Sequence, residues 1–486
     1  RDSRVDSIRP ARVFRLANQT TPRGIQRVKA APGGGSSADV DADIAILDTG
    51  IGPVGGGELN VVGGINCADD PASGSYDPDD WGDSHFGRHG THVAGTAAAR
   101  DNSIGVVGVA AGARLWSVRV FDGAYADETT IVCGLDWAIA TRGPAPPPGT
   151  QPIEVVNMSI QGPRGSTFEG CDPTDDDLIH VAVCGAKAAG ITVVAAAGNS
   201  AANANGSSPG GYRQVITVGA LSDFDGAGWG EASNDCGGYP KEKDDKYARY
   251  SNYGSDVDIV APGTCVLSTT TRPSGQSEDG KATKLLTGTS MAAPHVSGAV
   301  ARYLAKHPAT TPGKMRQIVR ASGRMDWDAK SDPVWSGVSD QDDPNRVLDV
   351  GALMGPDDLK VWLSHSGFKL GAGDRNRSTR VDVQRLGGYE GSAVLGLSGL
   401  PAGVGTGSFE QASLSGLGGL GTNLDLAVKA KGTEGAYELS VRAQGGGGSP
   451  SGSRGLGLIV DRTGPSVSNL GSRPVGGQEP LAASGA

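Results

Sequence analysis

From Asp43 onwards, short apolar runs alternate with stretches rich in alanine. A strand that is apolar along its whole length is buried on both faces of its sheet, and helices between such strands make the sheet parallel. We therefore expect an α/β fold with a doubly wound, mostly parallel sheet flanked by helices. The expected strands are IAILD, LWSVRV, IEVVNMSI, ITVVAAAG and QVITVGA, and the expected helices cover residues 90–99, 133–140, 178–189 and 290–306.

The chain has 486 residues, which is long for a single domain. Residues 1–35 are rich in arginine and end in the turn-forming run APGGGSS, so we expect an N-terminal arm or a propeptide remnant there. The α/β domain then covers residues 36–355. Short alternating runs such as LKVWLSH and YELSVRAQ predict a small all-β sandwich at residues 356–444. The run GGGGSPSGSRG predicts a flexible linker and a truncated or disordered tail at residues 445–486.

Charge and hydropathy argue against several classes of partner. The formal net charge is −10, which disfavours binding to nucleic acid and to anionic membranes. No run of apolar residues is long enough to span a bilayer. The first residue is Arg1, without the features of a signal peptide, so we expect that any such peptide has been removed or left out.

Six cysteines, without the CxxC spacing of a metal site, favour disulfides and an oxidising compartment. We therefore expect a secreted, extracellular protein. The alternative is that they are buried free thiols of a cytosolic enzyme. Their number alone leaves the pairing open.

Three segments together supply the side chains that acyl transfer to a serine requires. Asp48 ends an apolar strand, His89 opens a helix of small residues, and Ser290 begins the helix MAAPHVSGAVARYLA. A serine hydroxyl becomes a useful nucleophile when a histidine takes its proton and a carboxylate orients that histidine. Asn199 follows another apolar strand, and its amide is a candidate donor to an oxyanion.

Each of these residues also has a simpler interpretation. Asp48 and Asn199 are residue types common in turns, and serine is a favoured N-cap, which would explain Ser290. His85 and His92 compete with His89 for the role of the base.

Seven motifs, in this order along the chain, resemble those of the subtilisin-like serine peptidases, the subtilases. They are DTGI, HGTHVAGT, NSIGVVGVA, NMSI, AAAGN, NYGSDVDIVAPG and GTSMAAPHVSG, within residues 19–355. The resemblance implies a secreted serine endopeptidase of broad specificity that acts on polypeptides as a monomer. It makes Asp48 the orienting acid, His89 the general base and Ser290 the nucleophile, with Asn199 and the Ser290 amide as the oxyanion hole.

The resemblance also implies where substrate binds. An extended polypeptide would pair with residues 124–126 on one side and residues 159–161 on the other. The implied binding residues are Ala124, Tyr125, Ala126, Ser159, Ile160, Gln161, Ala195, Ala196 and Gly198. Gln161 stands where the family often has glycine, so it is expected to crowd or polarise the specificity pocket. The segment 200–210 has no acidic residue, which favours an apolar or neutral side chain at P1, the residue whose carbonyl is attacked.

A calcium site is implied in the same way. Side-chain oxygens would come from Gln19, Glu58 and Asn102, and backbone carbonyls from Arg100, Ile104 and Val106. Glu58 replaces the usual aspartate. The acidic run at residues 68–83 is either a second cation site or a solvated face.

Spacing like that of the family suggests the disulfides Cys67–Cys133, Cys171–Cys184 and Cys236–Cys265. The C-terminal part resembles bacterial immunoglobulin-like modules, for which binding, stabilisation and plain spacing are the options, with a spacer favoured. Two other functions stay open: an inactive subtilase scaffold that serves as a binding protein, and an adhesion function in the C-terminal module.

Overall fold

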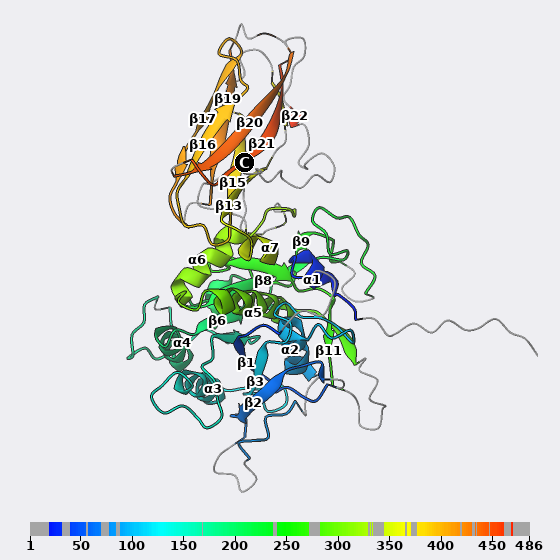
Figure 1. Ribbon diagram of the computed structural model, residues 1–486, viewed down its shortest axis with the longest axis vertical. Helices are drawn as coiled ribbons and strands as arrows, with labels where there is room; N and C mark the ends of the chain where they lie inside the picture. Colours follow the sequence, from blue (N-terminus) through cyan, green and yellow to red (C-terminus); the bar gives the residue numbers. More distant parts are fainter. Residues whose placement is uncertain are drawn as a thin grey trace, which may run out of the picture.

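The computed structural model describes most of the chain between residues 19 and 469. Within that range it leaves out residues 32–38, 55–56, 70–76, 84–87, 168, 237–240, 272–281, 329–330, 332, 334–344, 365–366, 371–376, 418–419, 430–432, 434, 447 and 461–467. The described residues form an α/β body followed by a β-rich part (Figure 1).

The α/β body is built on a sheet with the strand order β10-β8-β6-β4-β1-β3-β2, in which every neighbouring pair is parallel. The two-residue strand β9 is added antiparallel to β8. The strands are β1 (Asp43–Asp48), β2 (Val61–Asn66), β3 (Arg114–Arg119), β4 (Val155–Met158), β6 (Thr192–Ala196), β8 (Ile216–Ser222), β9 (Lys246–Tyr247) and β10 (Ile259–Pro262). The predicted α/β fold with a mostly parallel sheet is confirmed.

Helices cover both faces of this sheet. The helices are α1 (Arg23–Arg27), α2 (His89–Ala98), α3 (Glu128–Ala140), α4 (Leu178–Ala188), α5 (Thr289–Lys306), α6 (Pro312–Ser322) and α7 (Val350–Leu353). Ile44 and Ile46 of β1 share one core with α2 and α5, whereas Ala45 and Leu47 share the other with α3 and α4. Burial on both faces explains why residues 44–47 of this strand are all apolar.

Helix α3 begins five residues before the predicted start at Cys133. Asp127 caps it, because its side chain accepts a hydrogen bond from the backbone N–H of Thr130 at 2.9 Å. The sequence analysis also missed α6 and the antiparallel pair β11 (Val266–Thr269) and β12 (Thr283–Leu286). Two short strands, β5 (Gly162–Pro163) and β7 (Ser207–Ser208), pair antiparallel beside the main sheet.

The prediction of an N-terminal arm is wrong for residues 19–31. Ile25 and Val28 lie in the same core as α2 and α5. Arg27 is fully buried and forms ion pairs with Asp223, Asp245 and Asp326, at 2.8, 3.0 and 3.0 Å. A buried guanidinium requires such partners, so the segment is an integral part of the fold. Residues 1–18 lie outside the described part of the chain.

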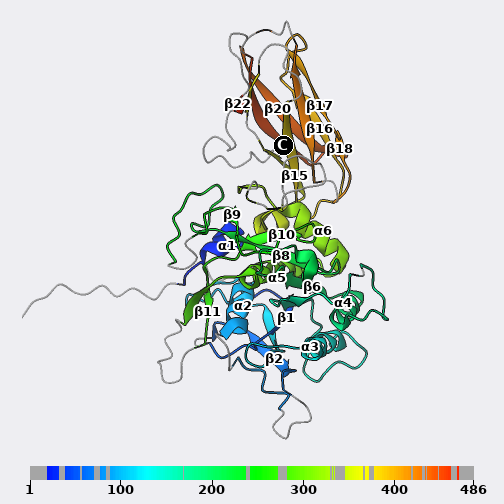
Figure 2. The same cartoon turned by 180° about the vertical axis from the view of Figure 1, so that it is seen from behind.

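Two mostly antiparallel sheets make up the β-rich part (Figure 2). One has the order β13-β15-β19-β17 and the other β18-β16-β20-β21-β14-β22, with a shared apolar core that includes Val361, Val383 and Leu458. The strands are β13 (Asp358–Leu363), β14 (Gly367–Leu370), β15 (Arg377–Leu386), β16 (Ala393–Ser398), β17 (Gly405–Phe409), β18 (Ser413–Leu414), β19 (Gly421–Val428), β20 (Gly435–Gly445), β21 (Ser451–Val460) and β22 (Ser468–Asn469).

A flexible linker from Gly445 was expected, and the structure differs there. Strand β21 pairs with β20 from Ser451 to Val460, so residues 451–455 of the glycine-rich run belong to a strand and only residues 446–450 form the hairpin connection. Glycine content indicated flexibility, but pairing with a long neighbouring strand outweighed it. Residues 470–486 of the predicted tail lie outside the described residues.

Buried polar contacts join the two parts. Arg346 donates to the backbone carbonyls of Val383 and Leu420 at 3.1 and 2.7 Å. Gln384 of β15 donates to the carbonyl of Ser322 in α6 at 2.7 Å. Leu420 also packs in the core of the α/β body. The β-rich part is therefore packed against the α/β body through buried contacts.

The six cysteines form three disulfides, Cys67–Cys133, Cys171–Cys184 and Cys236–Cys265. This is the pairing that the resemblance suggested. Among the residues that the structure describes, no helix is both long and apolar enough to cross a membrane.

Candidate active site

The carboxyl ends of three neighbouring strands carry polar residues that the sequence singled out. Strand β1 ends at Asp48, β4 ends one residue before Ser159, and β6 ends three residues before Asn199. Because β6, β4 and β1 are adjacent and parallel, these residues come to the same end of the sheet. Ligand sites of open α/β sheets lie at this end.

His89, the first residue of α2, contacts Asp48. Its Nδ1 lies 2.7 Å from Oδ1 of Asp48, which also accepts a hydrogen bond from the backbone N–H of Thr49 at 2.8 Å. The Asp48 side chain is fully buried, and that of His89 is 30% exposed. The close approach depends on Gly90, since a Cβ there would lie 2.1 Å from the carbonyl oxygen of Gly50.

The surroundings of His89 shift its proton affinity. Burial by itself lowers the pKa of His89, but the charge and hydrogen bond of Asp48 and the charge of Asp83 outweigh burial and raise it above the usual value. A histidine stabilised in this way as a cation, yet still partly exposed, suits a group that takes up and releases a proton.

Asp83 is a residue that the sequence analysis did not distinguish from the acidic run around it. Its side chain is buried and accepts hydrogen bonds from the hydroxyls of Thr91, at 2.6 Å, and Thr49, at 3.1 Å. Burial raises the pKa of Asp83 to about 6, against the opposing effect of these hydrogen bonds. The predicted solvated face is therefore wrong for Asp83, and nothing in the spacing of the acidic run would have revealed its position.

Ser290 lies in the first turn of α5. Its hydroxyl donates to the carbonyl oxygen of Ser159 at 3.3 Å, and the Ser159 hydroxyl donates to the carbonyl of Ser290 at 2.8 Å. The N-cap of α5 is Gly288, so the simple interpretation of Ser290 as a capping residue is wrong.

Asn199 lies beside Ser290. Its Oδ1 accepts hydrogen bonds from the N–H and the hydroxyl of Thr289, at 2.8 and 3.0 Å, which leaves its Nδ2 as the donor. A Cβ built on Gly288 would lie 3.5 Å from Asn199 Nδ2 and 3.7 Å from the backbone nitrogen of Ser290. Asn199 Oδ1 lies 3.6 Å from the same point, so the carboxamide of Asn199 lies close to the start of α5, beside the backbone nitrogen of Ser290.

His92 does not share this environment. Nε2 of His92 lies 3.0 Å from the carbonyl oxygens of both Val266 and Lys284, and burial lowers the pKa of His92 to about 3. His92 is therefore a neutral packing residue. His85 lies outside the described residues.

The predicted substrate residues fall into two groups. Tyr125 is 84% exposed, in a turn where Asp122 and Tyr125 exchange backbone hydrogen bonds, with Ala124 and Ala126 beside it. Ser159 and Ile160 are almost buried, and Gln161 is exposed. Ala195 and Ala196 lie inside β6, where both belong to the core, so their side chains are not accessible in this structure. Gly198 lies next to Asn199.

The expected calcium ligands converge. The side-chain amide of Gln19 donates to the carbonyls of Arg100 and Val106. Glu58 is fully buried, and its Oε1 accepts a hydrogen bond from the backbone N–H of Val106 at 2.6 Å. Oδ1 of Asn102 accepts from the N–H of Ile104 at 3.2 Å.

The surroundings of the Glu58 carboxylate are suited to a bound cation. Its Oε2 is buried and has no hydrogen-bond partner among the described residues. Burial raises the pKa of Glu58 to about 7, although hydrogen bonds from Val106 and Asn102 oppose that shift. A buried carboxylate oxygen without a partner is the kind of ligand that suits calcium.

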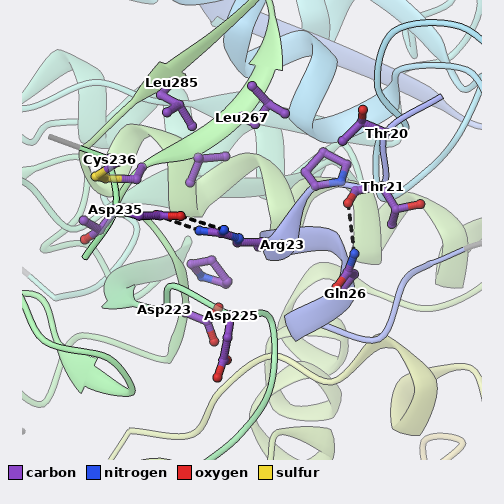
Figure 3. A pocket seen from close by; sticks show the side chains of 16 residues that line it. Thr20, Thr21, Arg23, Gln26, Asp223, Asp225, Asp235, Cys236, Leu267 and Leu285 are labelled. Carbon is purple, nitrogen blue, oxygen red and sulfur yellow. Dashed lines mark hydrogen bonds and ion pairs between the residues drawn. A yellow bond between two sulfur atoms is a disulfide. The ribbon is translucent and has the colours of Figure 1, made fainter. Parts of the chain in front are cut away.

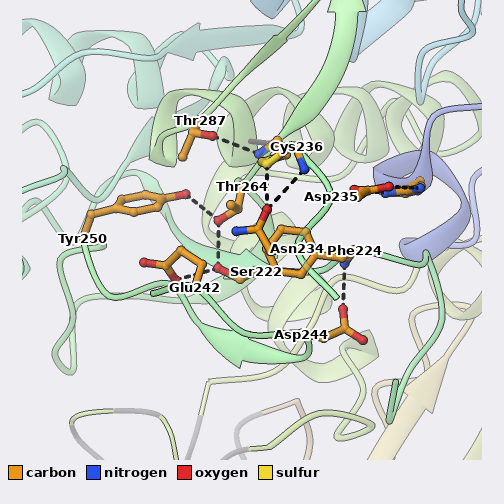
Figure 4. Close-up of a disulfide and its surroundings, with 12 residues drawn as sticks. Ser222, Phe224, Asn234, Asp235, Cys236, Glu242, Asp244, Tyr250, Thr264 and Thr287 are labelled. Atoms are coloured by element: carbon orange, nitrogen blue, oxygen red, sulfur yellow. Dashed lines mark hydrogen bonds and ion pairs between the residues drawn. A yellow bond between two sulfur atoms is a disulfide. The ribbon is translucent and has the colours of Figure 1, made fainter. Parts of the chain in front are cut away.

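Another acidic cluster lies elsewhere, beside a cavity of about 470 Å³ between α1 and β11 (Figure 3). It consists of Asp223, Asp225 and Asp244, whose oxygens lie within 4.8 Å of one another. Asp223 pairs with Arg27, and Asp244 accepts from the backbone N–H of Phe224 at 2.6 Å, near the Cys236–Cys265 disulfide (Figure 4). Asp223 thus anchors α1 through Arg27, whereas Asp244 holds the segment at Phe224.

Comparison with known proteins gives consistent matches over the α/β body. The sequence model of the subtilase family matches residues 41–342. Subtilisin of Bacillus pumilus is 33% identical over 309 residues, covering 63% of this chain and 92% of that protein. Subtilisin NAT of Bacillus subtilis subsp. natto is 33% identical over 309 residues, 63% of this chain, which spans 66% of that protein's length. A solved structure described as a cold adapted subtilisin-like serine proteinase is 26% identical, with a TM-score of 0.47 over 68% of this chain and 98% of its own.

Proposed function

Because this chain belongs to the subtilase family, we propose that it is a serine endopeptidase that hydrolyses peptide bonds through an acyl-enzyme. The observation that carries the proposal is the contact of His89 with a fully buried Asp48, at the end of the sheet where Ser290 and Asn199 also lie. A buried carboxylate that accepts from Nδ1 leaves Nε2 of the neutral imidazole free to act as a base.

The catalytic cycle assigns one role to each of these residues. His89 takes the proton of the Ser290 hydroxyl as Ser290 Oγ attacks the peptide carbonyl carbon. The Nδ2 of Asn199 and the N–H of Ser290 stabilise the negative oxygen that forms. His89 then gives its proton to the leaving amine, the C–N bond breaks, and water hydrolyses the ester by the same steps. Asp48 stabilises the imidazolium throughout.

Substrate would bind as an extended strand between residues 124–126 and residues 159–161. Such pairing recognises the backbone of the substrate more than its side chains, which favours broad specificity at the positions outside P1. The exposure of Tyr125 and the position of Ser159 next to the nucleophile support this assignment.

A calcium ion held by Gln19, Glu58, Asn102 and the carbonyls of Arg100, Ile104 and Val106 would stabilise the fold, because it would neutralise the buried carboxylate of Glu58. The three disulfides support secretion into an oxidising, extracellular environment, where the enzyme would act as a monomer. The β-rich part would be an immunoglobulin-like accessory domain with a stabilising role, supported by the buried contacts of Arg346.

A fluorophosphonate probe tests the proposal. We expect stoichiometric labelling of the full chain, mapped to Ser290, together with hydrolysis of casein. Ser290→Ala should abolish both while leaving the melting temperature nearly unchanged. Folded wild-type protein that is neither labelled nor active would instead support the inactive scaffold.

A further inference from the structure

The side chain of Gln161 joins two segments that follow neighbouring strands of the sheet. Its Oε1 accepts a hydrogen bond from the backbone N–H of Asn199 at 2.7 Å, and its Nε2 donates to the hydroxyl of Ser200 at 2.7 Å. Both polar ends of the carboxamide therefore have partners on one short segment, which holds the group in one orientation. We call this arrangement the Gln161 bridge.

The bridge lies beside the reacting groups. Ser159, two residues before Gln161, accepts the hydrogen bond of the Ser290 hydroxyl, and Asn199 carries the amide that would bind the oxyanion. A carbonyl attacked by Ser290 must point its oxygen at that amide. In the binding mode proposed above, the P1 residue would lie between residues 159–161 and 198–200, with its side chain extending along these two segments.

Gly198 shows how little room the bridge leaves. A Cβ built on Gly198 would lie 2.8 Å from Cδ and 3.0 Å from Oε1 of Gln161. The carboxamide therefore rests directly on the backbone of Gly198 and takes up space that a large P1 side chain would need. A large P1 side chain can occupy this space only if it displaces the carboxamide of Gln161 and breaks both hydrogen bonds of the Gln161 bridge.

We propose that Gln161 determines the P1 specificity of this enzyme by restricting that position to small, uncharged side chains such as alanine, glycine and serine. The inference rests on the proposed peptidase function and deepens it by naming the substrate class. It also links P1 recognition to the oxyanion site, because the residue that limits P1 accepts its hydrogen bond from Asn199.

Peptide p-nitroanilides that differ only at P1 test this inference. For the wild-type full chain, kcat/KM with alanine at P1 should exceed that with phenylalanine by roughly tenfold or more. In Gln161→Gly the value for phenylalanine should rise by roughly tenfold to a hundredfold, while that for alanine changes only about threefold. Ser200→Ala removes one of the two hydrogen bonds but keeps the carboxamide, so its effect on the ratio should be intermediate.

Gln151→Gly is the matched control, because Gln151 is exposed in the loop before β4. This variant should keep the wild-type ratio. Fluorophosphonate labelling of Ser290 and the melting temperature show whether each variant is folded with an intact nucleophile.

Three outcomes would overturn the inference. One is a ratio of kcat/KM for alanine to that for phenylalanine that stays within twofold of wild type in Gln161→Gly. Another is a wild-type enzyme that already prefers phenylalanine at P1. The third is an equal fall in kcat/KM for all substrates, which would mean that Gln161 positions Asn199 without selecting P1. In each of these cases the peptidase assignment stays intact if the protein is active and labelled by the fluorophosphonate. A wild type that is neither labelled nor active would contradict both the peptidase assignment and the inference about P1.

Discussion

The carboxylate of Asp83 and the hydroxyl of Thr91 lie 2.6 Å apart, and this contact ties the segment before α2 to the first turn of that helix. The other oxygen of Asp83 accepts from Thr49, the residue after Asp48. Asp83 therefore connects the segments that carry both members of the Asp48–His89 pair. Its charge is also one of the effects that raise the pKa of His89.

Replacing Asp83 should change how activity depends on pH. The pKa of Asp83 is about 6, so above that pH its negative charge stabilises the imidazolium of His89. Asp83→Asn removes this charge, the pKa of His89 falls, and the acidic limb of the kcat/KM profile should move to lower pH. Profiles between about pH 5 and 9 measure the shift. Asp79→Asn is the control, since Asp79 is exposed in the same acidic run. If the acidic limb of the kcat/KM profile does not move in Asp83→Asn, the prediction is wrong.

Asp48→Asn should lower kcat by about 10⁴-fold with little change in KM. An amide at this position would hold the imidazole in the wrong tautomer and would not stabilise its cation. Steady-state kinetics with a peptide p-nitroanilide measure the effect. Loss of less than tenfold in folded protein would mean that Asp48 does not orient the base.

Asn199→Ala should lower kcat by about 10²–10³-fold, the range known for an oxyanion donor in subtilisin. The hydrogen bonds from Thr289 are lost as well, so melting curves must accompany the kinetics. The expected signature is a fall in kcat with KM nearly unchanged, because the amide acts on the oxyanion and not on bound substrate. A rise in KM alone would assign Asn199 to substrate binding.

Removal of calcium should lower the melting temperature of the wild type, since the buried Oε2 of Glu58 would lose its partner. Glu58→Gln should lose most of the stabilisation that calcium gives, as measured by thermal unfolding with calcium and with a chelator. Asp225→Asn is the comparison, because Asp225 belongs to the other acidic cluster. If Asp225→Asn alone abolishes the effect, the cation binds there and the assignment to Glu58 is wrong.

Arg346→Ala should destabilise the full chain by about 2–4 kcal/mol, because the buried hydrogen bonds from Arg346 to the carbonyls of Val383 and Leu420 are lost, although the carbonyl of Leu420 keeps the one from the N–H of Val383. Denaturant unfolding measures the change. Arg442→Ala, an exposed arginine on β20, should stay within about 0.5 kcal/mol of wild type. Equal stability of Arg346→Ala and wild type would restore the view of the β-rich part as a spacer.

The sequence predicted the central strands of the parallel sheet well, because they are buried on both faces and therefore show an apolar signal that needs no tertiary knowledge. It missed β2, which is only partly buried, and β10. The N-terminal segment and the hairpin after Gln444 were predicted incorrectly for the opposite reason. Arg27 is buried only because three distant aspartates surround it, and β21 forms only because β20 offers a partner. Neither the partners of Arg27 nor the pairing of β21 can be predicted from local composition.

By itself the sequence determined the fold class of the α/β body and the candidates Asp48, His89, Asn199 and Ser290, because strand patterns and short motifs are local properties. Only the tertiary structure decided that His89, and not His92, meets Asp48, that Asp83 is buried beside Asp48 and His89, and that Gln161 reaches across to Asn199 and Ser200. Those relations join residues that lie far apart along the chain. They arise from the order of β6, β4 and β1 in the sheet and from the packing of α2 and α5 against it.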